Sequence, residues 1–263
     1  MKAKKRIIFT LLYESGNFVL SRNFRLQSIG NYDWLQKNYN FSNVSYHIDE
    51  LVILDVTREN RNKNDFSNIV KKISENIFVP LTVGGGINSI EDAKLFFQSG
   101  ADKVSINSYL FNKKNLAKEI CNIYGKQCLV GSLDIKKENN EYLIYTNNGN
   151  NLVFSIDRFF KQNEICENIG ELYINSINQD GTGNGLDFRL ANIVNKKSSI
   201  PFIIAGGIGK IEDIKDSFKS EFIDALSTAH LLNFIGESLK NARILCKDNG
   251  ISLASWPNID QIF

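Results

Sequence analysis

The stretch Gly85-Gly86-Ile87-Asn88-Ser89-Ile90-Glu91-Asp92 returns 121 residues later as Gly206-Gly207-Ile208-Gly209-Lys210-Ile211-Glu212-Asp213. The dipeptide Glu50-Leu51 returns at the same distance as Glu171-Leu172. Two matches at one spacing indicate a duplicated half-domain, because a unit of this length is too long for a solenoid repeat. Each glycine pair follows a short apolar run and precedes a helix-like pattern, so both halves are predicted to contain strand–turn–helix units.

Short apolar runs alternate with longer amphipathic stretches on both sides of these turns. Several runs are nearly continuous in Val, Ile and Leu, as is typical of parallel strands buried on both faces. We expect strands at 6–12, 50–55, 80–84, 102–107, 127–133, 171–176, 201–205 and 222–227. We expect helices at 32–45, 64–77, 89–98, 112–124, 153–168, 187–197, 210–218 and 234–249, with Ser89 and the acids after it starting the third. Residues 137–150 interrupt the alternation and are interpreted as an inserted hairpin after the fifth strand, with a short strand at 142–145.

Eight strands alternating with eight helices predict an α/β fold, a parallel (β/α)8 TIM barrel built from two (βα)4 half-barrels. No linker-like segment separates the halves, so residues 1–263 are expected to form a single barrel domain. An open doubly wound sheet is the alternative arrangement of the same elements.

The composition excludes several classes of protein. The formal net charge of +2 gives no sign of a nucleic-acid or membrane-surface partner, and we expect neither. No window approaches the roughly 18 apolar residues of a membrane span. The basic start, Met1 to Arg6, precedes an apolar run too short for a signal peptide, so we expect a first strand and a cytoplasmic protein. Four separated cysteines and two histidines favour neither disulfides nor a metal centre, and we expect no metal and no cofactor.

The two glycine turns are candidate phosphate cradles. Backbone N–H groups of a glycine turn, followed by a helix N-terminus, bind anions well. Tight turns that need glycine for positive φ are the alternative. Because the two turns lie at symmetric positions, we expect a phosphorylated small-molecule ligand with two phosphates. The residues assigned to its phosphates are Gly85, Gly86, Asn107 and Ser108 on one side and Gly206, Gly207, Ala229 and His230 on the other.

Polar residues also follow the strands at the end where barrel enzymes place their active sites. Asp134 comes directly after the fifth predicted strand and is the candidate general acid or base. A solvated aspartate at a strand end is the alternative. The remaining candidates for ligand binding are Asp55 at the end of the second strand, Asn175 at the end of the sixth, and Asp180, Gly181 and Thr182 in the loop that follows.

Four charged residues lie at the opposite ends of the strands. Arg6, Glu50, Lys103 and Glu171 each stand at or near the start of a predicted strand. Two cations and two anions would balance in a ring across the barrel floor, provided that every charge is paired. Four separate charges on the rim are the alternative.

From residue 4 to about residue 235 the sequence resembles the HisF family, the cyclase (synthase) subunit of imidazole glycerol phosphate synthase. The stretches that carry the resemblance are Lys5-Arg6-Ile7-Ile8, Ile48-Asp49-Glu50-Leu51-Val52, Thr82-Val83-Gly84-Gly85-Gly86-Ile87, Gly100-Ala101-Asp102-Lys103-Val104-Ser105-Ile106-Asn107, Ser176-Ile177 and Asp180-Gly181-Thr182.

The resemblance implies a (β/α)8 barrel in a heterodimer with a HisH-like glutaminase, which docks on the N-terminal face of the strands. Ammonia then crosses the barrel through a charged gate. At the other face it attacks a bisphosphorylated ribulosyl nucleotide, giving imidazole glycerol phosphate and aminoimidazole carboxamide ribonucleotide. Arg6, Glu50, Lys103 and Glu171 match the gate residues, and Asp102 matches a position that faces the glutaminase.

The sequence departs from the family at residues that carry its chemistry. The resemblance implies two catalytic carboxylates, one ending the first strand and one ending the fifth. Asp134 matches the second, but Leu12 occupies the first and cannot exchange a proton. Loss of one general acid or base typically lowers a rate by about 10²–10⁴-fold. A lysine of the loop after the first strand is replaced by Leu20, a serine of the seventh strand by Ala205, and a small residue of the eighth by His230.

Leu12 and Asn175 resemble the marks of a subgroup of second-copy cyclase subunits linked to acetamidino modification of surface-polysaccharide sugars. That resemblance implies a chain that supplies ammonia, or an activated nitrogen, to a sugar amidotransferase. Two alternatives stay open. The first is an authentic cyclase of histidine biosynthesis with a rewired acid/base pair, for which Glu14 is a candidate carboxylate. The second is an ammonia conduit without chemistry of its own. The gate charges disfavour the sister barrel isomerase. The segment Trp256 to Phe263 lies beyond the resemblance and is expected to pack on the barrel or contact a partner.

Overall fold

Eight parallel strands close into a barrel in the structure, a computed structural model that describes residues 4–39, 41–161 and 163–254. In order around the barrel they are β1 (Arg6–Glu14), β4 (Glu50–Asp55), β5 (Leu81–Gly84), β6 (Lys103–Ile106), β7 (Leu129–Glu138), β10 (Glu171–Ser176), β11 (Phe202–Ala205) and β12 (Ala225–Thr228). Pairing of β7 with β10 and of β12 with β1 completes the ring. This confirms the predicted barrel and excludes the open doubly wound sheet.

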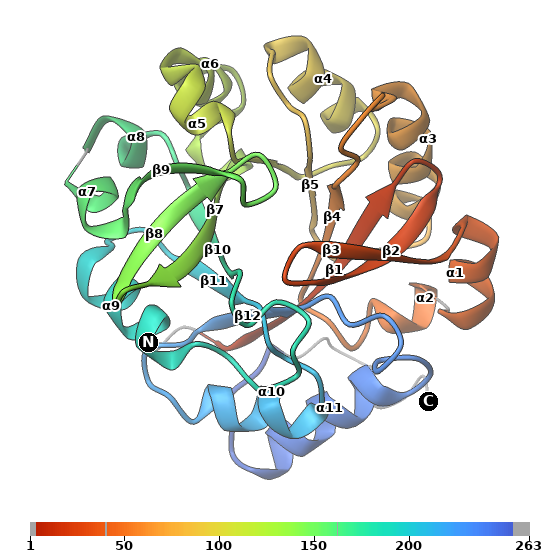
Figure 1. Ribbon diagram of the computed structural model, residues 1–263. Helices are drawn as coiled ribbons and strands as arrows, with labels where there is room; N and C mark the ends of the chain where they lie inside the picture. Colours follow the sequence, from red (N-terminus) through yellow and green to blue (C-terminus); the bar gives the residue numbers. More distant parts are fainter. Residues whose placement is uncertain (1–3, 40, 162, 255–263) are drawn as a thin grey trace.

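Helices surround the strands (Figure 1). Their bounds are α1 (Tyr32–Asn38), α2 (Phe41–Val44), α3 (Lys63–Ser74), α4 (Ile90–Gln98), α5 (Tyr109–Asn112), α6 (Lys114–Tyr124), α7 (Ile156–Phe160), α8 (Asn163–Glu167), α9 (Phe188–Lys197), α10 (Ile211–Phe218) and α11 (Ser238–Asp248), with a 3-10 turn at Lys126–Cys128. No helix in the described part of the chain is both long and apolar enough to cross a membrane.

The helices predicted at 32–45 and 153–168 are each broken in the structure, whereas the one predicted at 112–124 forms as α6. Tyr39 ends α1 in an extended conformation, because its ring is drawn into the core against Phe9 and its hydroxyl donates to the carbonyl of Leu231. Lys113 separates α5 from α6 with non-helical backbone angles. Residues 151–155 form a strand instead of the expected helix start, and Ser155 then caps α7.

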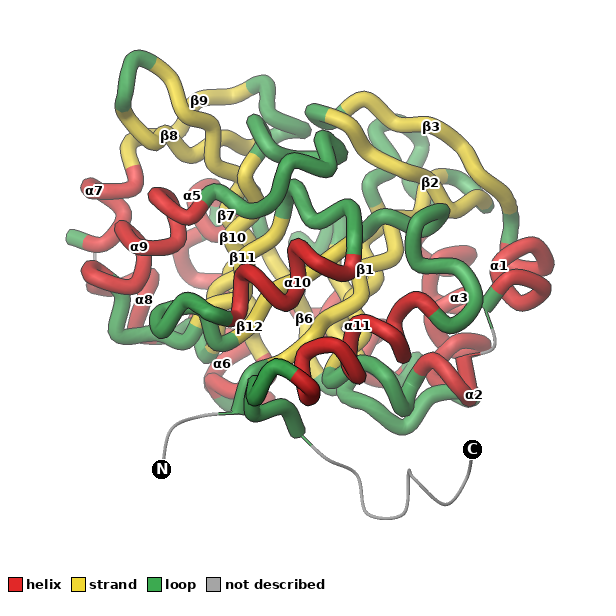
Figure 2. The backbone as a smooth tube through the Cα atoms, turned by 90° about the horizontal axis from the view of Figure 1, so that it is seen from below, coloured by secondary structure: helices red, strands yellow, loops and turns green. Residues whose placement is uncertain are grey.

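Two antiparallel hairpins extend from the barrel at the same end (Figure 2). One continues β7 into β8 (Glu141–Thr146) and β9 (Asn151–Ser155), which confirms the inserted hairpin but adds a strand that was not predicted. The other, β2 (Asn17–Arg22) and β3 (Arg25–Gly30), continues β1 and was missed entirely. Its residues alternate in burial only weakly, so their sequence shows little strand periodicity. The predicted contacts of Trp256 to Phe263 lie outside the described residues.

The start of α4 agrees with the prediction. Ser89 has extended backbone angles, and its hydroxyl accepts a hydrogen bond from the backbone N–H of Asp92 at 3.2 Å. Ser89→Ala removes this cap and is expected to lower the free energy of unfolding by about 1 kcal/mol. Urea denaturation of the variant beside Ser28→Ala, at an exposed serine of β3, measures the difference. Equal stability of the two variants would contradict the role of the cap.

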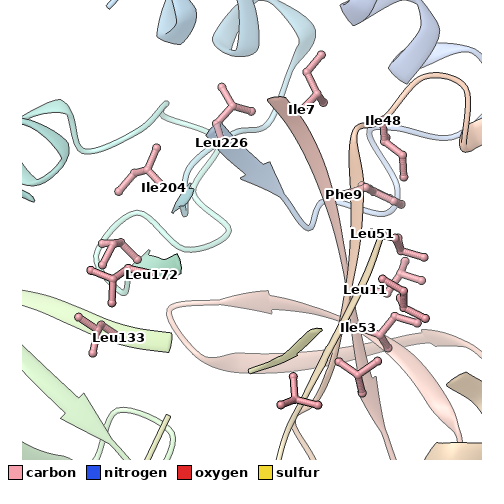
Figure 3. Packing of buried hydrophobic residues seen from close by; sticks show 14 of the residues in the cluster. Ile7, Phe9, Leu11, Ile48, Leu51, Ile53, Leu133, Leu172, Ile204 and Leu226 are labelled. Carbon is pink, nitrogen blue, oxygen red and sulfur yellow. The ribbon is translucent and has the colours of Figure 1, made fainter. Parts of the chain in front are cut away.

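Alternate residues of each barrel strand face opposite sides, and this alternation positions the site. Outward side chains such as Ile7, Phe9 and Leu51 form the core between strands and helices, part of which appears in Figure 3. Inward side chains form a second, smaller cluster that includes Ile8 and Val52. Below this inner layer the inward positions are charged, and above it polar side chains line the mouth together with a few apolar ones such as Leu12. The interior is therefore divided into a charged floor, an apolar middle and a polar mouth.

Candidate functional site

A cavity of about 500 Å³ occupies the mouth of the barrel, at the carboxyl ends of the strands. The predicted residues that line it are Asp55, Gly85, Gly86, Asn107, Ser108, Asp134, Asn175, Asp180, Gly181, Gly206, Gly207, Ala229 and His230. Thr182 does not line it, because its hydroxyl bonds within its own loop, donating to the carbonyl of Gln179 at 2.9 Å. The barrel thus gathers candidates from both sequence halves around one space.

The two glycine turns have matching backbone conformations. Gly85 and Gly206, the equivalent residues of the repeat, have φ of 111° and 96°. A Cβ on Gly206 would lie 2.7 Å from the carbonyl oxygen of Ser176, and one on Gly85 would overlap the backbone of Asp55. Both turns therefore require glycine for conformation and for space. Each turn borders the cavity and is followed by a helix, α4 or α10. The geometry suits two anionic groups held by backbone N–H donors.

Asp134 is the candidate proton-transfer group of the cavity. Its carboxylate accepts hydrogen bonds from the side-chain amides of Asn107, at 2.9 Å, and Asn175, at 3.3 Å. Burial raises the pKa of Asp134 to about 7, although the two amides act in the opposite direction. A carboxyl group with a pKa near neutrality can both accept and donate a proton at physiological pH.

The raised pKa makes stability depend on pH. The folded protein keeps a proton on Asp134 that the unfolded chain releases above about pH 4, so this stabilisation is present at low pH and is lost as pH rises through about 7. Asp134→Asn is therefore expected to increase the free energy of unfolding at pH 8 by about 1–3 kcal/mol. The gain should shrink as pH falls toward 4.

Urea denaturation of Asp134→Asn at pH 8 and at pH 4.5 checks this, with Asp248→Asn at an exposed helix end as the control. A stability difference that is the same at both pH values would show that Asp134 titrates normally.

The four charged residues at the strand starts form a closed ring across the barrel floor. Lys103 Nζ lies 2.9 Å from Glu50 Oε2 and 3.0 Å from Glu171 Oε2. Arg6 pairs with Glu171 and lies 3.5 Å from Glu50 Oε2. Thr82 adds a hydrogen bond to Glu50 at 2.5 Å. The alternative of four separate rim charges is therefore excluded.

Mutual pairing decides the ionisation of this ring. Burial alone would lower the pKa of Lys103, but the carboxylates of Glu50 and Glu171 outweigh it and the pKa is raised. Burial alone would raise the pKa of Glu171, but Arg6 and Lys103 outweigh it and the pKa is lowered. Arg6, Lys103 and Glu171 are held in their charged forms, so removing one would leave its partners unpaired in a largely buried place.

The model of the family described as histidine biosynthesis protein matches residues 27–235. A protein of Parasynechococcus marenigrum, provisionally named imidazole glycerol phosphate synthase subunit hisF2, is 43% identical over 97% of this chain and 95% of its own length. The chain belongs to the HisF family. Imidazole glycerol phosphate synthase subunit HisF of Clostridium botulinum (strain Alaska E43) is 36% identical over 91% of this chain and 94% of its own length. Imidazole glycerol phosphate synthase subunit HisF of Exiguobacterium sp. is 31% identical over 95% of this chain and 96% of its own length.

In this HisF-family chain the departures from the family pattern also line the cavity. Leu12, Leu20, Ala205 and His230 all border it. Burial lowers the pKa of His230. Glu14 does not replace a carboxylate at Leu12: it is the last residue of β1, pairs with Asn17 of the hairpin and borders a separate shallow hollow. The strand-one position of Leu12 therefore carries no proton-transfer group.

Two of the predicted ligand-binding carboxylates are engaged in holding loops. Asp55 lies 3.0 Å from Arg61 Nε and accepts the backbone N–H of Thr57 at 2.9 Å. Asp180 accepts hydrogen bonds from the Ser21 hydroxyl at 2.6 Å and the Phe24 backbone at 3.0 Å. Burial raises the pKa of both carboxyl groups. Asp180 thus fixes the β2–β3 hairpin over the mouth, a role that its position in the sequence did not indicate.

Several cavity residues were missed from the sequence. Thr10, Tyr173 and Ser227 form a hydrogen-bonded cluster deep in the cavity, with oxygen–oxygen distances of 2.7–3.2 Å. Tyr173 lies two residues after Glu171, so strand alternation would have placed it facing inward. Arg22, Arg25, Arg58 and Arg61 also border the cavity. They lie on the unpredicted hairpin and on the loop after β4, where no periodicity marks an inward direction.

Asp102, the predicted partner-facing residue, lies on the floor side. It immediately precedes Lys103 of the ring and is exposed. Its carboxylate accepts the backbone N–H of Leu81 at 2.8 Å, which fixes the start of β5.

Proposed function

We propose that this chain is the barrel subunit of a glutamine-dependent system, and that it passes ammonia from a HisH-like glutaminase to a phosphorylated ligand in its mouth cavity. The support is one combination of residues: the floor ring of Arg6, Glu50, Lys103 and Glu171 is complete, whereas Leu12 has replaced one carboxylate of the mouth. Ammonia passage needs the ring, and cyclase chemistry needs both carboxylates. The chain has kept the first set and lost part of the second.

The interior offers ammonia a graded route. Ammonia is small and neutral, so it can pass an apolar layer such as that of Ile8 and Val52 more readily than an ion. Above that layer the hydroxyls of Thr10, Tyr173 and Ser227 offer hydrogen-bond partners at the cavity base. Exposed Asp102 beside the ring would face the glutaminase on the same side. A heterodimer is the assembly that this arrangement fits, and we propose that it works in the cytoplasm.

The ligand in the mouth would be held at both ends. The turns at Gly85 and Gly206 would bind one phosphate each, and Asp134 between them would accept or donate the proton that nitrogen transfer requires. We propose acetamidino modification of a surface-polysaccharide sugar as the pathway served, with a sugar amidotransferase downstream. Its support is the loss of the strand-one carboxylate together with Asn175 beside Asp134.

Authentic cyclase activity in histidine biosynthesis is the second candidate. Asp134 favours it, because a pKa of about 7 is suited to acid/base catalysis and both glycine turns border the same cavity. This activity converts the bisphosphorylated ribulosyl nucleotide and ammonia to imidazole glycerol phosphate. Leu12 counts against it, because the strand-one position opposite Asp134 then carries no group to exchange a proton.

The proposal is tested by combining the chain with a HisH-like glutaminase and the sugar amidotransferase, and measuring glutamine-dependent amidated sugar. A one-to-one complex and product formation are expected. Asp134→Asn should lower product formation by about 10²-fold or more while the complex remains intact. Unchanged product formation with this variant would leave the chain as a conduit only. Absence of any complex with the glutaminase would contradict the ammonia-transfer function itself.

A further inference from the structure

The tip of the β2–β3 hairpin carries an arrangement of positive charge that the proposed function has not used. Arg22 and Arg25 are directly opposite each other across the hairpin, on either side of a two-residue turn. Both side chains are exposed and border the mouth cavity. Like charges at directly opposed positions repel each other and destabilise a hairpin. Their placement is therefore unfavourable for the hairpin itself.

A third guanidinium reaches the same tip from the barrel. Arg58, in the loop after β4, donates through Nη2 to the carbonyl oxygen of Phe24, the second residue of the turn. In the described part of the chain no ion pair involves Arg22, Arg25 or Arg58. Arg61 differs from them, since Asp55 neutralises it. Three cations that form no ion pair among the described residues thus gather at one edge of the cavity.

Hydrogen bonds fix the tip of the hairpin in place. The backbone N–H groups of Asn23 and Phe24 donate to Asp180, and the Asn23 amide donates to the carbonyl of Ile177 at 2.9 Å. Asn23 and Phe24 have φ of 49° and 63°, and such values are unfavourable for a bulky residue like Phe. These hydrogen bonds fix the turn over the mouth, so the backbone that carries Arg22 and Arg25 is preorganised above whatever the cavity binds.

We propose that Arg22, Arg25 and Arg58 form a third anion site, which binds an oxyanion (a carboxylate or a phosphate) of the ligand whose two phosphates occupy the glycine turns. The proposal rests on the proposed function, because it assumes a bisphosphorylated ligand in the cavity. Guanidinium groups bind such oxygens by paired, charge-assisted hydrogen bonds. The substrate would then carry an acidic group between its phosphates. It would be more anionic than a simple sugar bisphosphate.

A matched pair of probes separates this site from the phosphate cradles. Arabinitol 1,5-bisphosphate has two phosphates, and 2-carboxyarabinitol 1,5-bisphosphate adds one carboxylate between them. Isothermal titration at low ionic strength should show about tenfold tighter binding of the carboxylated probe to the unmodified chain. In the double variant Arg22→Gln/Arg25→Gln the ratio should fall to within about twofold. Arg189→Gln, at an exposed arginine that does not border the cavity, should leave the ratio unchanged.

Each outcome decides one level of the proposal. Equal affinity of the two probes for the unmodified chain, or an unchanged ratio in the double variant, overturns the third site while the phosphate cradles stand. Failure of both probes to bind overturns the cradles, and the third site falls with them. Arg22→Lys/Arg25→Lys keeps the charge and should retain at least part of the preference. If the preference for the carboxylated probe is lost in the lysine variant as well as in the glutamine variant, the hairpin has been disturbed, and this counts against the third anion site.

Discussion

Lys103→Glu is expected to lower glutamine-dependent product formation by about 10²-fold while ammonium-dependent formation stays within about threefold of normal. Lys103 is the cation that lies between Glu50 and Glu171, at 2.9 and 3.0 Å. Its reversal would place three carboxylates around Arg6 in a largely buried ring. Each unpaired buried charge costs several kcal/mol, so the ring would rearrange or admit water. Under the proposed function, ammonia from the glutaminase would cross this floor, whereas added ammonium salt would reach the cavity from the mouth.

The two nitrogen sources are compared in the assembled pathway, with the glutaminase present in both assays. Lys94→Glu makes the same charge change at an exposed position of α4 and should affect neither. Lys103→Met removes the charge without adding another, and should give a smaller glutamine-specific loss. Size-exclusion chromatography shows whether the complex persists. Equal loss with glutamine and with ammonium salt would mean that Lys103 supports folding or the mouth chemistry and does not control ammonia passage.

The barrel itself was predictable because buried parallel strands leave a strong signal. The strand at 171–176 was predicted to the residue, since its inward and outward faces are both buried and bounded by polar turns. The glycine turns were equally clear, because a positive φ at Gly85 and Gly206 leaves little choice of residue. The charged ring could be proposed from strand starts alone, but its closure depends on distances between four strands that no local pattern encodes.

The mouth was less predictable than the floor. The β2–β3 hairpin has exposed and half-buried residues on both faces, so the alternation that marks a strand is weak. Its turn, Asn23-Phe24, contains none of the glycine expected where both central residues have positive φ. As long as the hairpin is not predicted, Arg22 and Arg25 look like ordinary surface charges. Asp180 then looks like a ligand-binding carboxylate. The hairpin explains both, because Asp180 anchors it and the arginines lie at its tip.

Leu12→Asp is expected to create cyclase activity in a chain that otherwise has almost none. Leu12 on β1 and Asp134 on β7 are four strands apart in an eight-stranded barrel, so they face each other across the cavity. A ligand between them would then have a carboxylate on each side, one to donate a proton and one to accept it. We expect turnover of the bisphosphorylated ribulosyl nucleotide with excess ammonium salt at alkaline pH to rise by about 10²-fold over the unmodified chain.

The size of this gain is limited by what else the mouth lacks. Leu20 leaves the neighbouring hairpin without the lysine that the family pattern places there, so activity should remain below that of a complete cyclase. Leu12→Asn, which has a similar shape but cannot exchange a proton, should show no gain and separates chemistry from altered packing. Rapid turnover by the unmodified chain would instead mean that Asp134 works with another group. The histidine-pathway function would then replace the sugar pathway as the better account of this barrel.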